Sequence, residues 1–474
     1  VVERVVIGDD GAPDSGIGLE AAWLDGLGLG GLKVYASGGI EVREAVGVAP
    51  GGEIGLHATQ VDVLADLTAR GGSIALGNMV NRQTGANGGW VEAPIASAPP
   101  QAYEARTRIG EGVTLDARGM WTNLWQDKTS TGGMPYVDGG QILLASSGDV
   151  LLEAGSLVDV SSGATLKADG GTLSGGRGGS VSLHANAYAA SGAAAGKLVL
   201  EGEIRGHGVK GGGRLSLRSG EAIVIGGQVQ GSDGVLREGE TSLVDLVTDE
   251  AFTIAAGAVL PLDYQYTRTH AAAGEMLGSA PRVEAGNPGS WLTLATTWTP
   301  PRATGSSSYT IQTQDGRRIG VYSWATPAPI EAGTVIVAIS GASYFPTNWV
   351  VPASVFPQGM TVAPSAGVYK AGTVSPVDAV FMPGTVLAAG SRLPQSVAVR
   401  TPMHLDADTF QLGFSRYAVQ GMGGVAVAEQ AAVDVSMPVL RFDSQSGREV
   451  ASGAEPADAL AGWLPGLTLD DPAR

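Results

Sequence analysis

The sequence GGEIGL at residues 51–56 is followed, twenty residues later, by GGSIAL at residues 71–76. In both segments a glycine pair precedes a run in which apolar residues alternate with small or polar ones. The apolar positions are Ile54 and Leu56 in the first segment and Ile74 and Leu76 in the second. Alternation with a period of two is typical of a β-strand with one buried face. The two segments therefore predict equivalent strands of a repeat.

The same pattern recurs along the chain at intervals of 17–22 residues. A repeat of about 20 residues that holds two or three short strands favours a β-solenoid, because one coil cannot bury its apolar face alone and stacked neighbours supply the core. Stacked at about 4.8 Å, roughly 12–15 coils are expected to form a rod on the order of 60–70 Å long. The residues predicted to point inward include Ile54, Ile74, Ile142, Val181 and Leu215.

Two other architectures bear on this interpretation. A leucine-rich repeat needs L-x-x-L-x-L with an Asn and a helical return, and the sequence contains neither. An antiparallel β-sandwich, with the glycine pairs in its loops, stays open as an alternative. In a solenoid, the glycines are expected to supply positive φ angles at the corners between strands.

A longer stretch carries a family resemblance. Residues 148–163, GDVLLEAGSLVDVSSG, resemble the repeat of filamentous haemagglutinin-like large exoproteins, the passengers of two-partner secretion. Residues 113–119 and 432–436 carry the same coil ending, and the resemblance covers roughly 25–250 and 410–440. It implies a right-handed parallel β-helix, exported through an outer-membrane transporter partner of a Gram-negative bacterium and displayed on the cell surface or released as an adhesin. The Asn-Pro-Asn-Gly motif of the family's secretion domain does not occur in this sequence.

The composition changes along the chain and predicts three parts. We expect a parallel β-helix shaft over 1–261, with a loop excursion near 92–135. Fifteen of the 25 prolines lie between Pro261 and Pro402, and proline removes a donor from a strand ladder, so 262–409 is predicted to be an inserted β-rich module. Within it, residues 332–335, 371–374 and 383–386 each predict a turn before a strand. Residues 410–474 are expected to resume the coils and to end in a tail with a short helix at 456–464.

The net charge and the absence of cysteine exclude several classes of partner and of functional site. The formal net charge is −17, a field that repels phosphate backbones and anionic membrane surfaces. Nucleic acid is therefore not predicted as a partner. No apolar run approaches the roughly 20 residues of a membrane helix, so membrane insertion is not predicted either. Cysteine is absent, which excludes disulfides, thiolate metal sites and a cysteine nucleophile. Because residues 1–4 show neither an initiator Met nor a signal peptide, we interpret the chain as part of a longer polypeptide.

No motif predicts an enzyme, a cofactor or a metal site. The G-x-G-x-x-G at residues 26–31 is followed by a strand pattern rather than by a helix, so it does not predict dinucleotide binding. The five histidines have no partner three to five residues away, as a local zinc site requires. The aspartates at coil ends are predicted to accept hydrogen bonds from corner amides rather than to form a catalytic pair: Asp62, Asp116, Asp159 and Asp434.

These observations predict the structural shaft and adhesin segment of a secreted exoprotein that binds a cell-surface glycan or protein ligand. The stalk of a contact-dependent toxin-delivery exoprotein and a polysaccharide-active β-helix enzyme stay open as alternatives. Aromatic residues concentrate in the module, where core packing or ligand contact are both open. The candidate ligand-binding residues are Trp298, Tyr309, Trp324, Tyr344 and Trp349.

Overall fold

The computed structural model describes residues 2–8, 16–84, 90–94, 104–127, 136–187, 196–442 and 447–463. The structure is mostly β, with 42% strand and 5% helix. Its contacts divide the chain into two compact units, Val1–Phe252 with Met382–Arg474, and Thr253–Phe381. The second unit overlaps the module predicted at 262–409, whereas residues 382–409 belong to the first unit.

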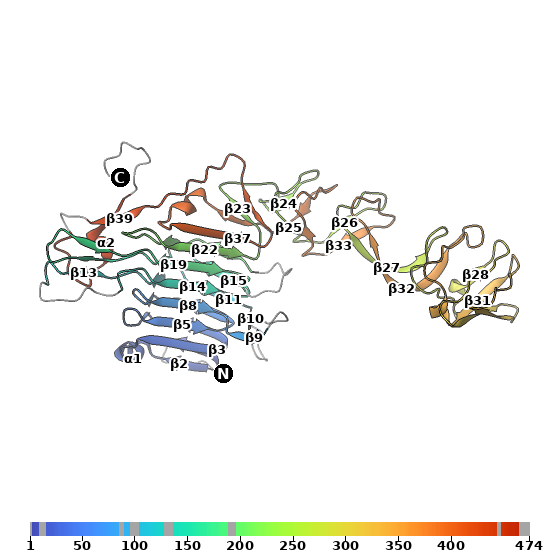
Figure 1. The fold of residues 1–474 in the computed structure, drawn as a ribbon, viewed down its shortest axis with the longest axis horizontal. Helices are drawn as coiled ribbons and strands as arrows, with labels where there is room; N and C mark the ends of the chain where they lie inside the picture. Colours follow the sequence, from blue (N-terminus) through green and yellow to red (C-terminus); the bar gives the residue numbers. More distant parts are fainter. Residues whose placement is uncertain are drawn as a thin grey trace. The chain divides into compact units, whose positions relative to one another are not determined.

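The first unit contains large parallel sheets built from three rows of strands, which the chain visits repeatedly in the same order (Figure 1). Strand β3 bends, so that its two halves join the first and second rows into one 13-stranded sheet. The first row consists of β3 (Gly31–Val42), β5 (Glu53–His57), β8 (Ser73–Gly77), β14 (Gln141–Ala145), β19 (Ser180–His184), β22 (Arg214–Ser219) and β37 (Arg416–Gly421). With the second half of β3, the second row contains β1 (Val2–Ile7), β2 (Gly16–Leu19), β6 (Gln60–Val63), β11 (Arg106–Ile109), β15 (Asp149–Leu152) and β20 (Leu198–Leu200). The third row contains β4 (Val46–Gly47), β7 (Leu67–Thr68), β12 (Thr114–Asp116), β16 (Leu157–Asp159) and β21 (Glu203–Arg205).

Apolar side chains in register build the core between the rows. Neighbouring strands of the first row align the five residues predicted to point inward, and all five are buried, which confirms that prediction. Residues from all three rows belong to one continuous hydrophobic cluster. Every strand pair within the three rows is parallel, which rules out an antiparallel sandwich for this part of the chain.

The glycine pairs serve two different purposes. Gly51 and Gly71, the first members of their pairs, have φ angles of +77° and +61°, as expected at a corner. The second members stack directly on one another, strand above strand. A Cβ at Gly72, Gly140, Gly179 or Gly213 would lie 2.0, 2.1, 1.9 or 1.5 Å from the carbonyl oxygen of the glycine in the preceding strand. These second glycines are therefore required by close backbone approach rather than by a positive φ.

Several segments leave the rows, so the first row has seven strands in the described chain instead of the 12–15 coils expected. Strands β9 (Val80–Thr84) and β10 (Trp90–Pro94) form an antiparallel hairpin. Strands β11 and β12 lie inside the excursion predicted near 92–135 but belong to the second and third rows.

A second group of segments forms a small side cluster around Trp121. Its strands are β13 (Trp121–Asn123), β17 (Ala164–Leu166), β18 (Leu173–Gly175), β39 (Val439–Phe442) and β40 (Leu460–Trp463). The helix expected at 456–464 is confirmed at its start, because α2 spans Pro456–Ala459, but β40 follows it directly. Helices α1 (Ala21–Gly26) and α2 are far too short to cross a bilayer, and no other α-helix occurs in the described ranges.

The remaining strands of the first unit form short pairs. Parallel strands β36 (Met403–Leu405) and β38 (Val425–Val427) flank β23 (Ile223–Ile225), and the 3-10 helix η3 spans Ala407–Gln411. Antiparallel pairs join β24 (Val235–Leu236) to β35 (Val397–Ala398) and β25 (Leu246–Val247) to β34 (Val386–Leu387).

The second unit is antiparallel and has its own core. Its four-stranded sheet has the order β28 (Leu292–Thr293), β31 (Val335–Ser340), β29 (Ser308–Thr313), β30 (Arg318–Tyr322). Two further strand pairs join β27 (Tyr264–Ala271) to β32 (Met360–Tyr369) and β26 (Phe252–Ile254) to β33 (Ala379–Phe381). The 3-10 helices are η1 (Pro288–Ser290) and η2 (Ala342–Tyr344). The predicted turns occur at Gly333, Gly372 and Gly384, whose φ angles are +79°, +80° and +87°.

Candidate binding surface

Three of the five predicted aromatic residues pack in the core of the second unit. Trp298 and Tyr309 are only 3% and 1% exposed, and Trp349 is partly buried with its ring centre 5.9 Å from that of Trp298. The Tyr309 hydroxyl donates a hydrogen bond to the Pro301 carbonyl oxygen, and burial raises the pKa of this tyrosine. Trp298 and Tyr309 thus stabilise the unit and present no surface to a ligand.

The other two predicted residues are exposed. Trp324 is 68% exposed and Tyr344, at the end of η2, is 44% exposed. The Trp324 ring packs against Tyr322, with ring centres 4.9 Å apart and an angle of 34° between the planes. Tyr322 is itself 42% exposed and was not among the predicted site residues. Its outward direction follows from the alternation in β30, where the neighbouring Val321 is buried.

Glycine and strand register shape the surface around these rings. A Cβ on Gly320 would lie 2.9 Å from the Tyr322 hydroxyl oxygen, so the tyrosine ring covers this glycine on the outer side of the sheet. The register of β29 with β30 then sets polar residues beside the ring: Tyr322 opposite Ser308, Gly320 opposite Thr310, and Arg318 opposite Gln312. We call Arg318, Tyr322 and Trp324, with Ser308, Thr310 and Gln312, the aromatic platform.

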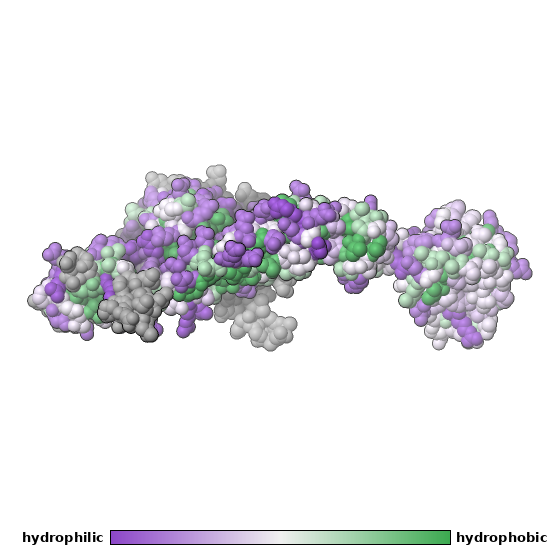
Figure 2. Space-filling view, turned by 90° about the horizontal axis from the view of Figure 1, so that it is seen from above, coloured by the Kyte–Doolittle hydropathy of each residue, from purple (hydrophilic) through white to green (hydrophobic). Residues whose placement is uncertain are grey.

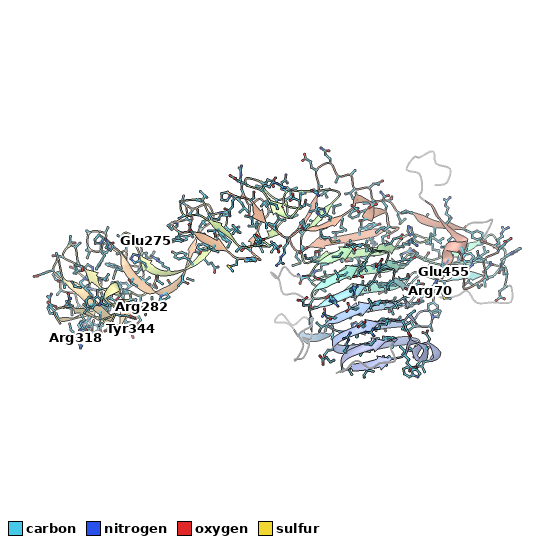
Figure 3. The ribbon with its side chains drawn as sticks, turned by 180° about the vertical axis from the view of Figure 1, so that it is seen from behind. Arg70, Glu275, Arg282, Arg318, Tyr344 and Glu455 are labelled. Atoms are coloured by element: carbon cyan, nitrogen blue, oxygen red, sulfur yellow. The ribbon has the colours of Figure 1, made fainter. Side chains whose placement is uncertain are left out.

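The aromatic platform has the chemistry of a recognition surface. Its two rings present a wide apolar area with little side-chain entropy to lose, and the hydroxyl and amide groups can donate and accept hydrogen bonds. Arg318 is exposed and forms no ion pair with any described residue, so its guanidinium is free to bind an acceptor (Figure 3). The platform holds neither a carboxylate nor a histidine, and so offers binding rather than acid–base chemistry.

The aspartates of the third row have structural partners. Asp116 Oδ1 accepts a hydrogen bond from the Arg118 backbone amide at 3.0 Å, and Asp159 Oδ1 accepts one from the Ser161 amide at 2.8 Å. The predicted bonds to corner amides are therefore confirmed at these two positions. Asp62 differs, because both of its carboxylate oxygens bind the Arg106 guanidinium.

An ionic cluster closes over Asp116 and Asp159. Arg70 Nη2 and Arg118 Nη1 lie 2.5 Å and 2.6 Å from the two oxygens of Glu455, just before α2 (Figure 3). Burial raises the pKa of Asp159, whereas Arg118 has a raised pKa because the hydrogen bond and charge of Asp116 outweigh its burial. These ion pairs connect the segment around Glu455 to residues that flank the third row.

We expect Glu455→Gln to loosen residues 447–463. Loss of the partly exposed ion pairs should cost about 1 kcal/mol and raise amide hydrogen exchange throughout this segment. The matched control is Glu449→Gln in the same segment, because Glu449 is exposed and forms no ion pair with a described residue. Unchanged exchange in Glu455→Gln would show that the hydrogen bonds and apolar contacts made by Trp121 and Asn123 hold the segment without the ion pairs.

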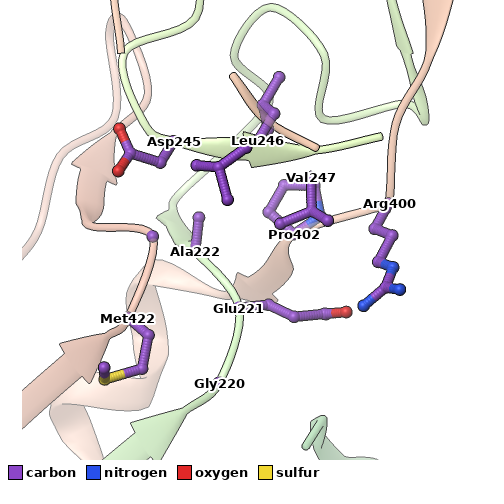
Figure 4. Close-up of a pocket in the computed structure, with 11 residues that line it drawn as sticks. Gly220, Glu221, Ala222, Asp245, Leu246, Val247, Arg400, Pro402 and Met422 are labelled. Carbon is purple, nitrogen blue, oxygen red and sulfur yellow. The ribbon is translucent and has the colours of Figure 1, made fainter. Parts of the chain in front are cut away.

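A cavity of about 170 Å³ lies in the first unit (Figure 4). Its walls are mostly apolar, including Leu246 and Met422, while Glu221 and Arg400 point toward one another at one side. Burial raises the pKa of Glu221, and the charges of Lys197 and Arg400 oppose that rise. The opposite charges of Glu221 and Arg400 offset one another, and Asp245, the third charged residue of the lining, accepts a hydrogen bond from the Ala389 amide.

Comparison with known proteins does not assign a function. No family model, no curated protein and no solved structure matched this chain. Within the described residues, no group of three or more His, Asp or Glu side chains converges as a metal site would require. Function must therefore be argued from the surfaces themselves.

Proposed function

We propose that this chain is the shaft and adhesin segment of a secreted, surface-displayed exoprotein of the filamentous haemagglutinin type. In this proposal the three rows are the faces of a right-handed parallel β-helix, and the aromatic platform contacts a glycan or protein on a host or neighbouring cell. Parallel rows visited in a constant order support the β-helix, and the repeat at 148–163 supports the family. The family resemblance also supports export through an outer-membrane transporter partner.

The observation that carries the binding role is the exposed ring pair of Tyr322 and Trp324. A tryptophan that is 68% exposed contributes little to the fold, and its ring packs against that of Tyr322. Exposed aromatic groups beside hydrogen-bonding side chains are typical of the residues that dominate binding energy. Figure 2 shows that the surface of each unit mixes hydrophilic and hydrophobic residues.

Trp324→Ala is expected to weaken binding of the purified chain to its target cells or to glycan-array ligands. Loss of a central aromatic contact typically costs about 2 kcal/mol, or roughly 30-fold in affinity, while the unfolding temperature should stay unchanged. Trp23→Ala is the control, since Trp23 in α1 is also exposed. Undiminished binding by Trp324→Ala would contradict the proposed role of the platform.

The stalk of a toxin-delivery exoprotein is the second candidate function. The repeat at 148–163 is compatible with either, because a stalk and an adhesin shaft need the same stacked strands. A toxin domain in the full-length protein beyond residue 474, together with binding that is independent of Trp324, would favour the stalk.

A further inference from the structure

A cationic face forms on the outer side of β19, β22 and β37, far in sequence from the aromatic platform. The strand register aligns three outward residues on each strand into a grid. Its first line is Ser180, Arg214 and Arg416; its second is Ser182, Ser216 and Ala418; its third is His184, Arg218 and Gln420. We call these nine residues the arginine grid. It contains three arginines and a histidine but no carboxylate, in a chain whose formal net charge is −17.

The second row shows how unusual this arrangement is within the protein. There, outward arginines meet carboxylates. Arg106 binds Asp62 on the neighbouring strand through Nε and Nη2, and Arg108 binds Glu153, just after β15, through the same two nitrogens. In the grid, Arg214 instead faces Arg416 directly. Like charges opposite one another on adjacent strands destabilise a sheet, and strands are about 4.8 Å apart. An anion between the two guanidinium groups would remove this repulsion.

The two arginines are available to such an anion. Both are exposed, and neither forms an ion pair or a side-chain hydrogen bond with any described residue. Arg218 is different, because its guanidinium lies against the Ala187 carbonyl oxygen and the Met422 sulfur. Ser216, between the lines, shares a hydrogen bond with His184 at 3.0 Å, and the serines supply further donors beside the arginines.

We infer that the arginine grid binds an anionic polysaccharide through its carboxylate or sulfate groups, with Arg214 and Arg416 as the principal contacts. The guanidinium fork matches the geometry of both groups. The grid has no aromatic residue on which nucleic-acid bases would stack, and the overall negative charge opposes a dense phosphate chain. A peptide could add a strand only at the open edge of β37, because β19 and β22 are paired on both sides, and it would then lie beside Arg416 instead of crossing the grid.

The test measures binding of the full chain to four end-labelled probes by fluorescence anisotropy. The probes are a heparin octasaccharide, an oligogalacturonate of the same length, neutral maltooctaose and a dT12 oligonucleotide. Arg214→Gln/Arg416→Gln is the test variant. Lys33→Gln/Arg282→Gln is the control with the same change of net charge, because these two residues are also exposed but already paired with Glu53 and Glu284.

We expect one or both acidic oligosaccharides to bind in a salt-sensitive manner, and maltooctaose not to bind. The test variant should bind at least about tenfold more weakly, since two charge-assisted contacts are lost, while the control should change less than about twofold. Equal weakening in test variant and control would overturn the site, as would no weakening. Binding of dT12 as tight as that of the acidic oligosaccharides would overturn the ligand class.

Stability gives a second measurement that does not depend on the probes. Because Arg214 and Arg416 repel one another, the test variant should unfold at the same or a higher temperature than the parent. Inorganic sulfate should raise the unfolding temperature of the parent more than that of the variant. The single variant Arg416→Gln, on the edge strand β37, should show the same direction of change in both measurements. An equal sulfate effect in parent and variants would count against the site.

Discussion

Replacing Gly140 by alanine is expected to disrupt the stack of parallel strands in the first unit and to destabilise it by about 3 kcal/mol or more. The added Cβ would lie 2.1 Å from the carbonyl oxygen of Gly72, well inside contact distance. That oxygen accepts the hydrogen bond of the Gln141 amide at 2.9 Å, so moving it away breaks a bond between two strands of the first row. Steric overlap and a lost hydrogen bond therefore act together.

Gly30→Ala is the matched control for this prediction. Gly30 belongs to the same series of glycine pairs, but its Cβ would meet no atom within 4 Å and its φ is not positive. Its unfolding free energy should change by no more than about 0.5 kcal/mol. Thermal and urea unfolding of both variants, monitored by circular dichroism, measures the two changes in unfolding free energy. If Gly140→Ala unfolded like the parent, the close stacking of second glycines would not be needed.

The strands of the first row were predictable because alternation and glycine pairs are local signals. A buried residue every second position identifies a strand without knowledge of its partner, and all five inward positions followed from that pattern. The number of coils did not follow. The hairpin of β9 and β10, the side cluster around Trp121 and the excursions after β23 use chain length without adding strands to the row. No local periodicity marks where a chain leaves such a stack.

The candidate binding residues show the same limit. An aromatic-rich segment does not reveal which rings are buried, and Trp298 and Tyr309 proved to be core. Alternation in β30 does distinguish the outward Tyr322 from the inward Val321. The arginine grid lies beyond such reasoning, because Arg214 and Arg416 are far apart in sequence and meet only through the register of β22 and β37. Local sequence therefore locates strands and faces, whereas sites made by register require the structure.

Leu215→Asp is expected to destabilise the first unit by about 4 kcal/mol or more, because a charge without a partner would enter an apolar core. Leu215 is 1% exposed and lies in register between Val181, which has no polar group, and Tyr417, whose single neutral hydroxyl cannot balance a buried carboxylate charge. Protonation of the new carboxyl group would offset part of the cost at low pH, so the difference from the parent should shrink as the solution is acidified.

Leu143→Asp separates burial from the chemistry of the substitution. Leu143 lies on β14 of the same row but on its outer side, where it is 40% exposed beside Ser182. The same leucine-to-aspartate change should there cost less than about 1 kcal/mol, since the carboxylate stays hydrated. Urea unfolding at neutral pH, repeated near pH 4, measures both variants. A large loss in Leu215→Asp with a small one in Leu143→Asp follows if the inner side of the row is dry. Equal losses of unfolding free energy in the two variants would instead mean that the two sides of the row are similarly solvated. The arginine grid depends on the distinction between core and outer face, and that distinction would then be removed.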